Sequence, residues 1–332
     1  MVTSAVNSAK AKLQIHVREA CDADREAVFE FCRHTWSWGD YIPHVWDRWL
    51  REENGKVFVA TVDGVPVGIQ HITIDKPGEA WLSGARTAPS YRRMGVATAI
   101  TMKCLEYAKS RGVKVARLVT ESDNAAALAA VQKMGFKPAA EFVEMTLEKV
   151  LSVDGGGEVS FWASLGHLDD VWFYLQSSEV YHKAAGLYTV LYHWYSLDKR
   201  DLERFVRQGK AITHSGKDGF VGGLVLVDDG VSSEWQEKSI QTCYIDGDFE
   251  TVLDMAKFLL AQCQEEGIEK IYGFTCNHPP ITEALERLGF KKPETKAIVF
   301  EKAYKTPHIP VAFCACPLLE VMTALIIAFL PH

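Results

Sequence analysis

Along the first half of the chain, hydrophobic and polar positions follow a succession of strand and helix patterns. Alternating positions and short apolar runs predict strands over 13–18, 56–62, 66–73, 79–87, 113–120 and 141–148. Apolar residues spaced by three and four predict helices over 22–33, 95–111 and 124–134. The dipeptide Asp63-Gly64 between two strands predicts a tight hairpin. A Trp-rich stretch before the hairpin is broken by Gly39 and Pro43, and no regular element is assigned to it.

The second half of the chain repeats this pattern. Segment 112–138 aligns with 267–293 almost without a gap, since both read as glycine, strand, polar turn, helix and Gly-Phe. A predicted helix over 249–266 and a strand over 220–227 are counterparts of earlier elements. Chance similarity of two strand-helix units is the alternative to an internal duplication.

Length and composition agree with two folded domains. The chain has 332 residues, of which 48% are hydrophobic, and this composition excludes disorder over its whole length. The segment SVDGGGE at 152–158 is typical of a linker. We therefore expect domains over 12–150 and 159–304, a glycine-rich linker over 151–158 and a separate tail over 305–332.

The charge balance and the Cys residues narrow the class of protein. Lys and Arg number 36 against 43 Asp and Glu, which gives a net charge of -7, so no global basic field attracts nucleic acid. The first ten residues lack the apolar core of a secretory signal, and we expect a cytoplasmic protein. The eight Cys residues show no C-x-x-C spacing, and we expect reduced core thiols. The alternative is a disulfide or a metal role, for which Cys314 and Cys316 would be the only close pair.

The C-terminal tail is hydrophobic. Residues 311–330 are apolar except at Pro317, Glu320 and Thr323, and this stretch is long enough to span a bilayer. Pro317 would kink such a helix, and Glu320 would lie inside it. Membrane association, packing against this protein or a partner, and a non-native or alternative terminus all stay open.

The turn RRMGVA at 92–97 carries recognisable chemistry. It lies between the strand predicted over 79–87 and the helix that follows. Small residues at 95 and 97 let backbone N–H groups approach a ligand, and such groups at a helix start are unpaired at the positive end of the helix dipole. Such a turn binds pyrophosphate. The alternative is a helix start with basic residues on a solvated surface.

The order of elements around this turn resembles the GCN5-related N-acetyltransferase (GNAT) superfamily over residues 13–150. The motifs that carry the resemblance are RRMGVA at 92–97 and NAAALAAVQKMGF at 124–136. Within the superfamily, the segments at 40–43, 46–50, 83–89 and 113–118 resemble histidine N-acetyltransferase-like proteins. The resemblance implies an α/β (α+β) fold: tandem GNAT-like copies, each with a mixed, mostly antiparallel sheet flanked by helices. The second copy is expected to be degenerate, because its turn TCYIDGDFETV is acidic and repels phosphate.

The resemblance implies acetyl-CoA as acetyl donor and no metal. The pyrophosphate would lie on the N–H groups of the turn, and the pantetheine along the preceding strand. The residues implied to bind this donor are Arg86, Thr87, Ala88, Arg92, Arg93, Met94, Gly95, Val96, Ala97, Thr98 and Asn124. Val131 stands where the family often has the Tyr that protonates the leaving thiolate, so no such acid is carried over.

The implied reaction is direct attack of a neutral amine on the thioester. Orienting the two reactants can supply about 7–11 kcal/mol, so modest acid–base help suffices. The amine must still lose a proton, and the candidate acceptors are Glu121, Glu79 and His71. For Glu79 and His71, a solvated strand-end carboxylate and a half-buried imidazole are the alternatives.

Three residues are candidates for holding the acceptor. Arg86 could clamp a carboxylate, or pair with a local Glu. Asp40 and Tyr41 lie on the loop that lines the acceptor side in this fold, where Asp40 could receive an imidazole or ammonium group. The Trp residues nearby wall an aromatic pocket or belong to the core: Trp36, Trp38, Trp46 and Trp49.

The leading hypothesis is an N-acetyltransferase, an acyltransferase that acetylates the α-amine of a free, histidine-like amino acid. A protein N-terminal or lysine acetyltransferase and a non-catalytic acetyl-CoA-binding protein are the alternatives. The expected partner is a small-molecule amine and no nucleic acid, with membrane contact through 311–330 and a homodimer as further candidates.

Overall fold

A computed structural model describes residues 13–304 except 38, 152–156, 217–218 and 230–237. The first half contains β1 (His16–Glu19), α1 (Arg25–Cys32), α2 (Ile42–Arg51), β2 (Gly55–Val62), β3 (Val65–Lys76), β4 (Glu79–Thr87), α3 (Val96–Ser110), β5 (Val115–Glu121), α4 (Ala125–Lys133) and β6 (Lys137–Leu147). The second half contains β7 (Ser160–Trp162), α5 (Leu168–Ser177), α6 (Glu179–Lys183), β8 (Leu187–Val190), β9 (His193–Ser196), α7 (Lys199–Arg207), β10 (Ala211–Ser215), β11 (Val221–Asp229), β12 (Ser239–Asp246), α8 (Phe249–Glu266), β13 (Lys270–Cys276), α9 (Pro279–Arg287) and β14 (Ala297–Ala303).

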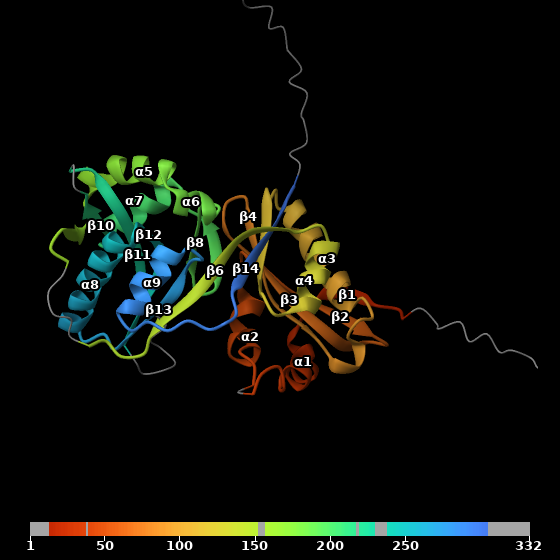
Figure 1. The fold of residues 1–332 in the computed structure, drawn as a ribbon. Coiled ribbons are helices and arrows are strands. Elements are labelled where there is room, and N and C mark those ends of the chain that lie inside the picture. The colour runs from red at the N-terminus through yellow and green to blue at the C-terminus, as the bar shows by residue number, and fades with distance from the viewer. Residues whose placement is uncertain (1–12, 38, 152–156, 217–218, 230–237, 305–332) are drawn as a thin grey trace, which may run out of the picture.

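One continuous, mostly antiparallel sheet runs through both halves. Its strand order is β1-β2-β3-β4-β5-β14-β6-β13-β12-β11-β10-β7. Read from its two edges, this order matches each strand of the first half with its counterpart in the second. The structure is therefore the predicted tandem of related α/β folds, with helices on the sheet faces (Figure 1).

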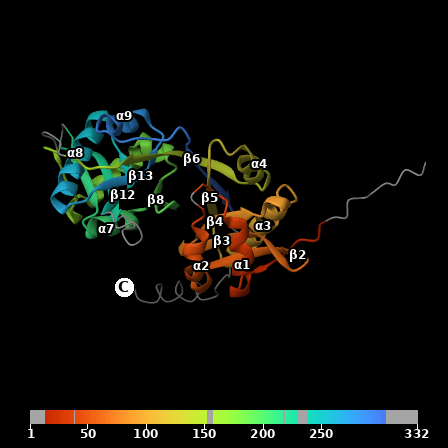
Figure 2. The same cartoon turned by 90° about the horizontal axis from the view of Figure 1, so that it is seen from below.

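The two halves exchange their last strands at the centre of the sheet. β14 ends the second half but pairs with β5 and β6 of the first. β6 ends the first half but also pairs with β13 of the second. In both views these strands run between the two lobes (Figures 1 and 2). Domains divided at 12–150 and 159–304 therefore share one sheet, and each half completes the other.

The predicted elements of the first half are present, with one addition. The segment around Pro43 forms α2, in which this proline occupies the first turn, a position that needs no N–H donor. β6 begins at Lys137, earlier than expected, because it pairs with β14 there. The second half also contains an α5–α7 region with the β8–β9 hairpin, which the sequence comparison does not predict.

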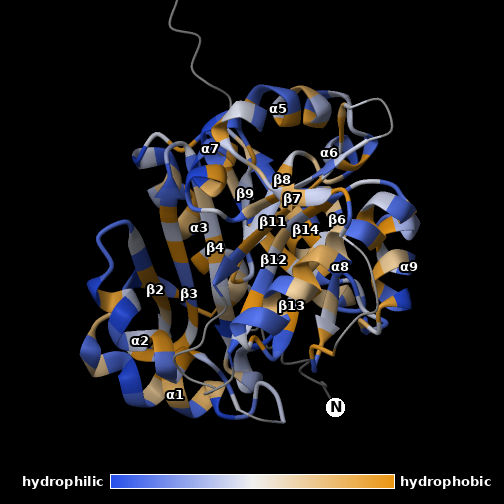
Figure 3. Ribbon diagram, turned by 90° about the vertical axis from the view of Figure 1, so that its left-hand side faces the viewer, coloured by the Kyte–Doolittle hydropathy of each residue, from blue (hydrophilic) through white to orange (hydrophobic). Residues whose placement is uncertain are grey.

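The strands of the first half bury both faces. Phe58 and Ala60 of β2 pack with α3 in one core, whereas Val57 and Val59 pack with α1 and α2 in another. The apolar colours therefore concentrate on the strands between the helix layers (Figure 3). The alternation leaves α3 and α4 on one side of the sheet and α1 and α2 on the other.

The structure describes only some of the residues that the Cys and tail predictions concern. In the described part of the chain Cys21 is exposed and five other cysteines are buried, all as free thiols. Cys314, Cys316 and the whole of 305–332 lie outside the described residues. Among the helices that the structure describes, none is long and apolar enough to cross a membrane.

Candidate active site

The two central strands of the first half stop pairing beside a bulge in β4. β4 and β5 pair in parallel only from Glu79 to Trp81 of β4. On its other edge, β4 pairs through Ser83 with His71 but through Arg86 with Ile69, so β4 contains one extra residue. This bulge leaves the edge of β4 beyond Trp81 free of β5.

The bulge requires a glycine. Gly84 adopts a φ of 62°, in the left-handed region. A Cβ at this position would lie 2.6 Å from Cη2 of Trp49 in α2. Any larger residue would therefore strain the bulge and displace α2.

The turn after β4 presents an open helix start. Gly95 is the N-cap of α3 with a φ of 91°, and no side chain caps the helix. Arg92, Arg93, Met94, Gly95, Ala97 and Thr98 are exposed, whereas Val96 is buried. Val96 anchors the turn, since a Cβ on Gly68 of β3 would lie 2.6 Å from its Cγ1. The first N–H groups of α3 and two Arg side chains thus lie around one exposed turn, an arrangement that favours an anion.

Of the other residues predicted to hold the donor, Thr87 and Ala88 lead into this turn, and Asn124 lies at the start of α4. Ala88 donates its N–H to Val67 O at 2.8 Å, and Arg92 Nε donates to Thr87 O at 3.4 Å. Asn124 begins α4, where its Oδ1 accepts the N–H of Ala127 at 3.1 Å. Val131 is 7% exposed and belongs to the core. Asn124 therefore caps a helix in this structure, with its amide nitrogen available for a ligand.

Arg86 and Asp40 bind each other. Arg86 Nε donates to Asp40 Oδ2 at 2.7 Å, and the Asp40 side chain is fully buried. The guanidinium lies 4.5 Å from the ring centroid of Trp36 and 5.4 Å from that of Tyr41. The predicted Arg pairing thus exists, but with Asp40 and not with a Glu. Each of these two charges is therefore already paired with the other.

Tyr41 lies beside the β4 bulge. Burial raises the pKa of its phenol, and the charge of Arg86 and a backbone hydrogen bond from Gly84 offset this only in part. The ring meets Trp49 edge to face at 6.0 Å. Trp46 and Trp49 are buried, Trp36 is 40% exposed, and residue 38 lies outside the described residues. The aromatic cluster is therefore mainly core, with one exposed edge.

His71 lies at the centre of a polar chain. Its Nδ1 is 3.1 Å from Ser83 Oγ, and its Nε2 is 2.7 Å from Glu52 Oε2. The ring stacks on Trp49 with a centroid distance of 4.2 Å. Burial lowers the pKa of His71, and the hydrogen bond and charge of Glu52 offset this only in part. His71 is therefore neutral at physiological pH and hydrogen-bonded toward the bulge.

Glu79, a second predicted proton acceptor, holds the two halves together. Its Oε2 accepts Arg117 Nη1 at 2.6 Å and the N–H of Ser196 at 3.0 Å. It lies where β4 and β5 still pair, before the strands separate. Its contacts thus give it a structural role at the closed end of the strand pair.

Glu121, the third predicted acceptor, is exposed at the end of β5. Burial raises the pKa of Glu144 on β6, and the charge of Glu121 adds to this effect. Glu144 also accepts the phenol of Tyr192 at 3.1 Å. Glu121 thus lies near a second acidic side chain on the same sheet.

The β8–β9 hairpin of the second half covers part of the sheet face that carries His71 and Ser83. The rings of His193 and Trp194 lie 5.5 Å and 5.6 Å from that of Trp81 on β4. Tyr195 donates to Asp75 Oδ2 at 3.2 Å, and the charge of His193 reaches His71. Residues of the second half therefore cover part of the sheet face that carries His71 and Ser83.

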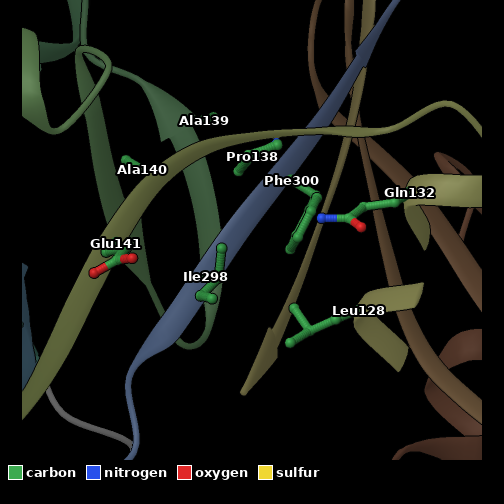
Figure 4. A pocket seen from close by; sticks show the side chains of 8 residues that line it. All are labelled: Leu128, Gln132, Pro138, Ala139, Ala140, Glu141, Ile298 and Phe300. Carbon is green, nitrogen blue, oxygen red and sulfur yellow. The ribbon is translucent and has the colours of Figure 1, made fainter. Parts of the chain in front are cut away.

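A cavity of about 360 Å³ lies elsewhere, between α4, β6 and β14. Leu128, Gln132, Ile298 and Phe300 point into it, and it does not include the β4 bulge or the turn before α3 (Figure 4). In the part of the chain that the structure describes, no cluster of His, Cys, Asp and Glu could hold a metal.

Sequence reasoning misses several residues of this site. Glu52 lies just past a helix that the sequence does not predict, and the β8–β9 hairpin has no counterpart in the alignment of the two halves. Ser83 could have been found from the sequence, since it shares a face with Trp81 on a predicted strand. The alternation places Ser83 and His71 on neighbouring strands, but register is needed to pair them.

Comparison with known proteins finds relatives of the first half. Residues 24–136 match the model of the acetyltransferase (GNAT) family. The chain is 31% identical over 115 residues to histidine N-acetyltransferase from Oreochromis niloticus, which covers 34% of each protein. It is 32% identical over 109 residues to an uncharacterized N-acetyltransferase from Methanocaldococcus jannaschii, covering 29% of this chain and 48% of that one. The match thus spans about a third of the length of the histidine enzyme.

A solved structure shares the fold over both halves. A GCN5-related N-acetyltransferase from Sphaerobacter thermophilus superposes with a TM-score of 0.56 at 10% identity, covering 87% of this chain and 95% of that one. At this identity the likeness concerns the fold alone. The fold expected from the sequence is thereby confirmed.

Proposed function

From the premise that residues 24–136 are a domain of the acetyltransferase (GNAT) family, we propose that the chain transfers an acetyl group from acetyl-CoA to an amine. The observation that carries this proposal is the uncapped start of α3 directly after a bulged strand that has left its neighbour. The turn fits an anion and the free strand edge fits an extended, amide-containing arm. The pyrophosphate and the pantetheine arm of coenzyme A have these two properties.

The residues around the turn fit this donor in charge and in shape. Arg92 and Arg93 supply positive charge in a protein of net charge -7, and the N–H groups of α3 supply hydrogen bonds. The amide nitrogen of Asn124 and the edge of β4 from Gly84 to Thr87 would contact the pantetheine. When bound, acetyl-CoA supplies an activated acyl group, and the chain has to place an amine beside it.

The finer proposal is that the acceptor is the α-amine of a histidine-like free amino acid. It is supported by the similarity to a protein named histidine N-acetyltransferase. The sheet face with His71, Tyr41 and the β8–β9 hairpin supplies aromatic surfaces for an imidazole. Arg86 would receive the carboxylate only by sharing its guanidinium with Asp40.

The test is release of free CoA thiol by the full chain with free amino acids, polyamines and short peptides as acceptors. Replacing Arg92 and Arg93 together by Glu should raise the KM for acetyl-CoA at least about tenfold, equivalent to about 1.4 kcal/mol. Asp248→Asn at the matching turn of the second half is the control and should leave this KM unchanged. No turnover with any amine, or an unchanged KM in the Arg variant, contradicts the proposal.

A further inference from the structure

A hydrogen-bonded chain of three side chains leads to the bulge of β4. Glu52, His71 and Ser83 are linked by contacts of 2.7 Å and 3.1 Å through the two ring nitrogens of the histidine. Glu52 is fixed at its other oxygen, which accepts Thr73 Oγ1 at 2.7 Å. The three groups come from the end of α2, from β3 and from β4, so the fold itself assembles them.

The surroundings hold this chain in one arrangement. The indole of Trp49 lies parallel to the His71 ring, with an interplanar angle of 5°. A Cβ on Gly55 would lie 2.6 Å from Glu52 Oε2 and 2.9 Å from His71 Nε2, so only glycine leaves room for the pair. His71 is 1% exposed, whereas Ser83 is partly exposed. Ser83 is therefore the end of the chain that a ligand can reach.

The proton positions follow from the acceptor chemistry of Glu52. Burial would raise its pKa, but hydrogen bonds from His71 and Thr73 outweigh burial and lower it. An ionised carboxylate only accepts, so His71 Nε2 carries the proton and donates it to Glu52. Nδ1 is then unprotonated and accepts the hydroxyl proton of Ser83.

Ser83 lies where the donor arm and the acceptor meet in the proposed function. It is the second residue after the last pair of β4 with β5, and the residue before Gly84 of the bulge. Its side chain lies on the sheet face that the β8–β9 hairpin walls. Of the three proton acceptors predicted from sequence, His71 is the one linked by a hydrogen bond to this position.

We propose that Ser83 and His71 form a proton relay that deprotonates the acceptor amine, with Glu52 as the positioning residue that fixes the histidine tautomer. The proposal rests on the proposed function. The proton of the acceptor ammonium first passes to Ser83 Oγ while the Ser83 proton passes to His71 Nδ1, which leaves a neutral amine. The amine nitrogen then bonds to the acetyl carbon as the C–S bond breaks. The electron pair of the C–S bond leaves on the CoA sulfur, which takes the second proton from the nitrogen, and His71 later returns its proton to solvent.

The test compares Ser83→Ala, Ser83→Thr and His71→Gln in the full chain. Positioned acid–base groups contribute about 10²–10⁴-fold, so Ser83→Ala and His71→Gln should lower kcat at pH 7 at least about 100-fold with the KM for acetyl-CoA unchanged. Ser83→Thr keeps the hydroxyl and should retain activity within about tenfold of wild type. The matched control is Thr101→Val, which removes a buried 2.7 Å hydrogen bond to Gln70 from the opposite face of β3.

The pH dependence separates a relay from a structural role. A neutral amine needs no base, so the deficit of Ser83→Ala and His71→Gln should shrink as the pH approaches the pKa of the acceptor amine. The charged and titratable groups that face His71 are Glu52, Asp75 and His193. His193→Gln and Asp75→Asn should show no such pH-dependent deficit, because neither residue bonds to Ser83 or to a ring nitrogen of His71.

Each outcome bears on a distinct claim. A deficit that stays constant with pH, or a Ser83→Ala enzyme with wild-type kcat, overturns the relay while leaving acetyl transfer intact. An acetyl adduct on Ser83 after mixing with acetyl-CoA alone overturns it in favour of a covalent route. A wild-type chain that binds acetyl-CoA but acetylates no amine overturns the proposed function and the relay with it. If His71→Gln fails to fold, the Ser83 variants decide, because Ala and Thr differ from Ser by only one group.

Discussion

The two halves of this protein share one topology but differ at the same two places. Both contain a bulge in the strand before the long helix, since β12 has an extra residue opposite β11 just as β4 has opposite β3. The helix starts then differ. α3 begins at Gly95 without a side-chain cap, whereas Asp248 caps α8 and accepts the N–H of Thr251 at 2.9 Å.

The end of β4 beyond Trp81 does not pair with β5, whereas the corresponding end of β12 in the second half is occupied by buried side chains. Asp246, 1% exposed, accepts the hydroxyls of Tyr174, Ser178 and Tyr244 at 2.8, 2.7 and 2.6 Å. A carboxylate at the helix start and buried hydroxyls at the strand end leave no place for a phosphate or a thioester arm. The degenerate copy predicted from the acidic turn thus has a structural cause.

The second half also contributes elements that pack against the first half. It supplies β14 next to β5 and the β8–β9 hairpin beside Trp81. Lys76 of β3 binds Asp201 of α7, and Glu79 binds the backbone of Ser196. The second half thus has a capped helix start and a filled strand end, while the first half depends on the strand and hairpin that the second half supplies.

Removing β14 tests this dependence most severely. A chain that ends at residue 296 lacks Val299 and Phe300, which are 0% and 1% exposed, and leaves β5 and β6 without the strand that joins them. Deleting buried side chains of this size costs about 2–5 kcal/mol each, so we expect loss of acetyl-CoA binding and of cooperative unfolding. A chain that ends at residue 304 is the matched control. Calorimetric binding by the shorter chain would show that the first half is self-sufficient.

Variants of the Arg86–Asp40 pair test whether this pair in the first half serves ligand binding or folding. Removing one partner of a buried ion pair costs about 3–5 kcal/mol, so Arg86→Gln should destabilise the protein strongly. Arg86→Gln combined with Asp40→Asn should recover most of that loss, because no buried charge is left alone. Denaturant unfolding measures both effects.

The same double variant separates the two roles in kinetics. If Arg86 also clamps a carboxylate, the KM for amino acids rises in the double variant while the KM for amines without a carboxylate stays unchanged. Equal changes for both acceptor classes would assign Arg86 to the fold alone.

The sequence predicts those features that depend on local pattern. The hairpin at Asp63-Gly64, α3, β5 and α4 follow from periodicity and turn residues, and all are present. The internal repeat also follows, because β13 and α9 keep the spacing of β5 and α4 within one residue. The exposed turn at 92–97 is where the motif places it.

The features that depend on long-range pairing do not follow from the sequence. The exchange of β6 and β14 is decided by strands 150 residues apart, and no local pattern encodes it. The sequence analysis misses α2, because Pro43 suggests a break in regular structure although proline is compatible with the first turn of a helix. The sequence makes Asp40 a candidate to receive an imidazole or ammonium group, but the structure pairs it with Arg86. The place of Arg86 on β4 depends on the bulge, which the sequence does not predict.

The smallest expected effect concerns the filled strand end of the second half. Burial raises the pKa of Asp246 and outweighs hydrogen bonds from Ser178, Tyr244 and Tyr174. The folded carboxyl therefore holds its proton to higher pH than the unfolded one, whose ordinary pKa is 3.8. As pH rises above that value, the unfolded state ionises first, and the free energy of unfolding falls until the folded pKa is passed.

Asp246→Asn cannot ionise and should escape this loss. The difference in unfolding free energy between the Asn variant and wild type should thus move in favour of Asn as pH rises from about 4, by about 1.4 kcal/mol per unit of pKa shift, and then stay constant. Urea unfolding at a series of pH values measures it. Tyr174→Phe removes one donor to the carboxylate and should extend the window to higher pH. A difference that is flat with pH, or that moves in favour of wild type, would mean that Asp246 is ionised in the fold. The second half would then hold a buried negative charge at the place that corresponds to the proposed substrate site of the first half.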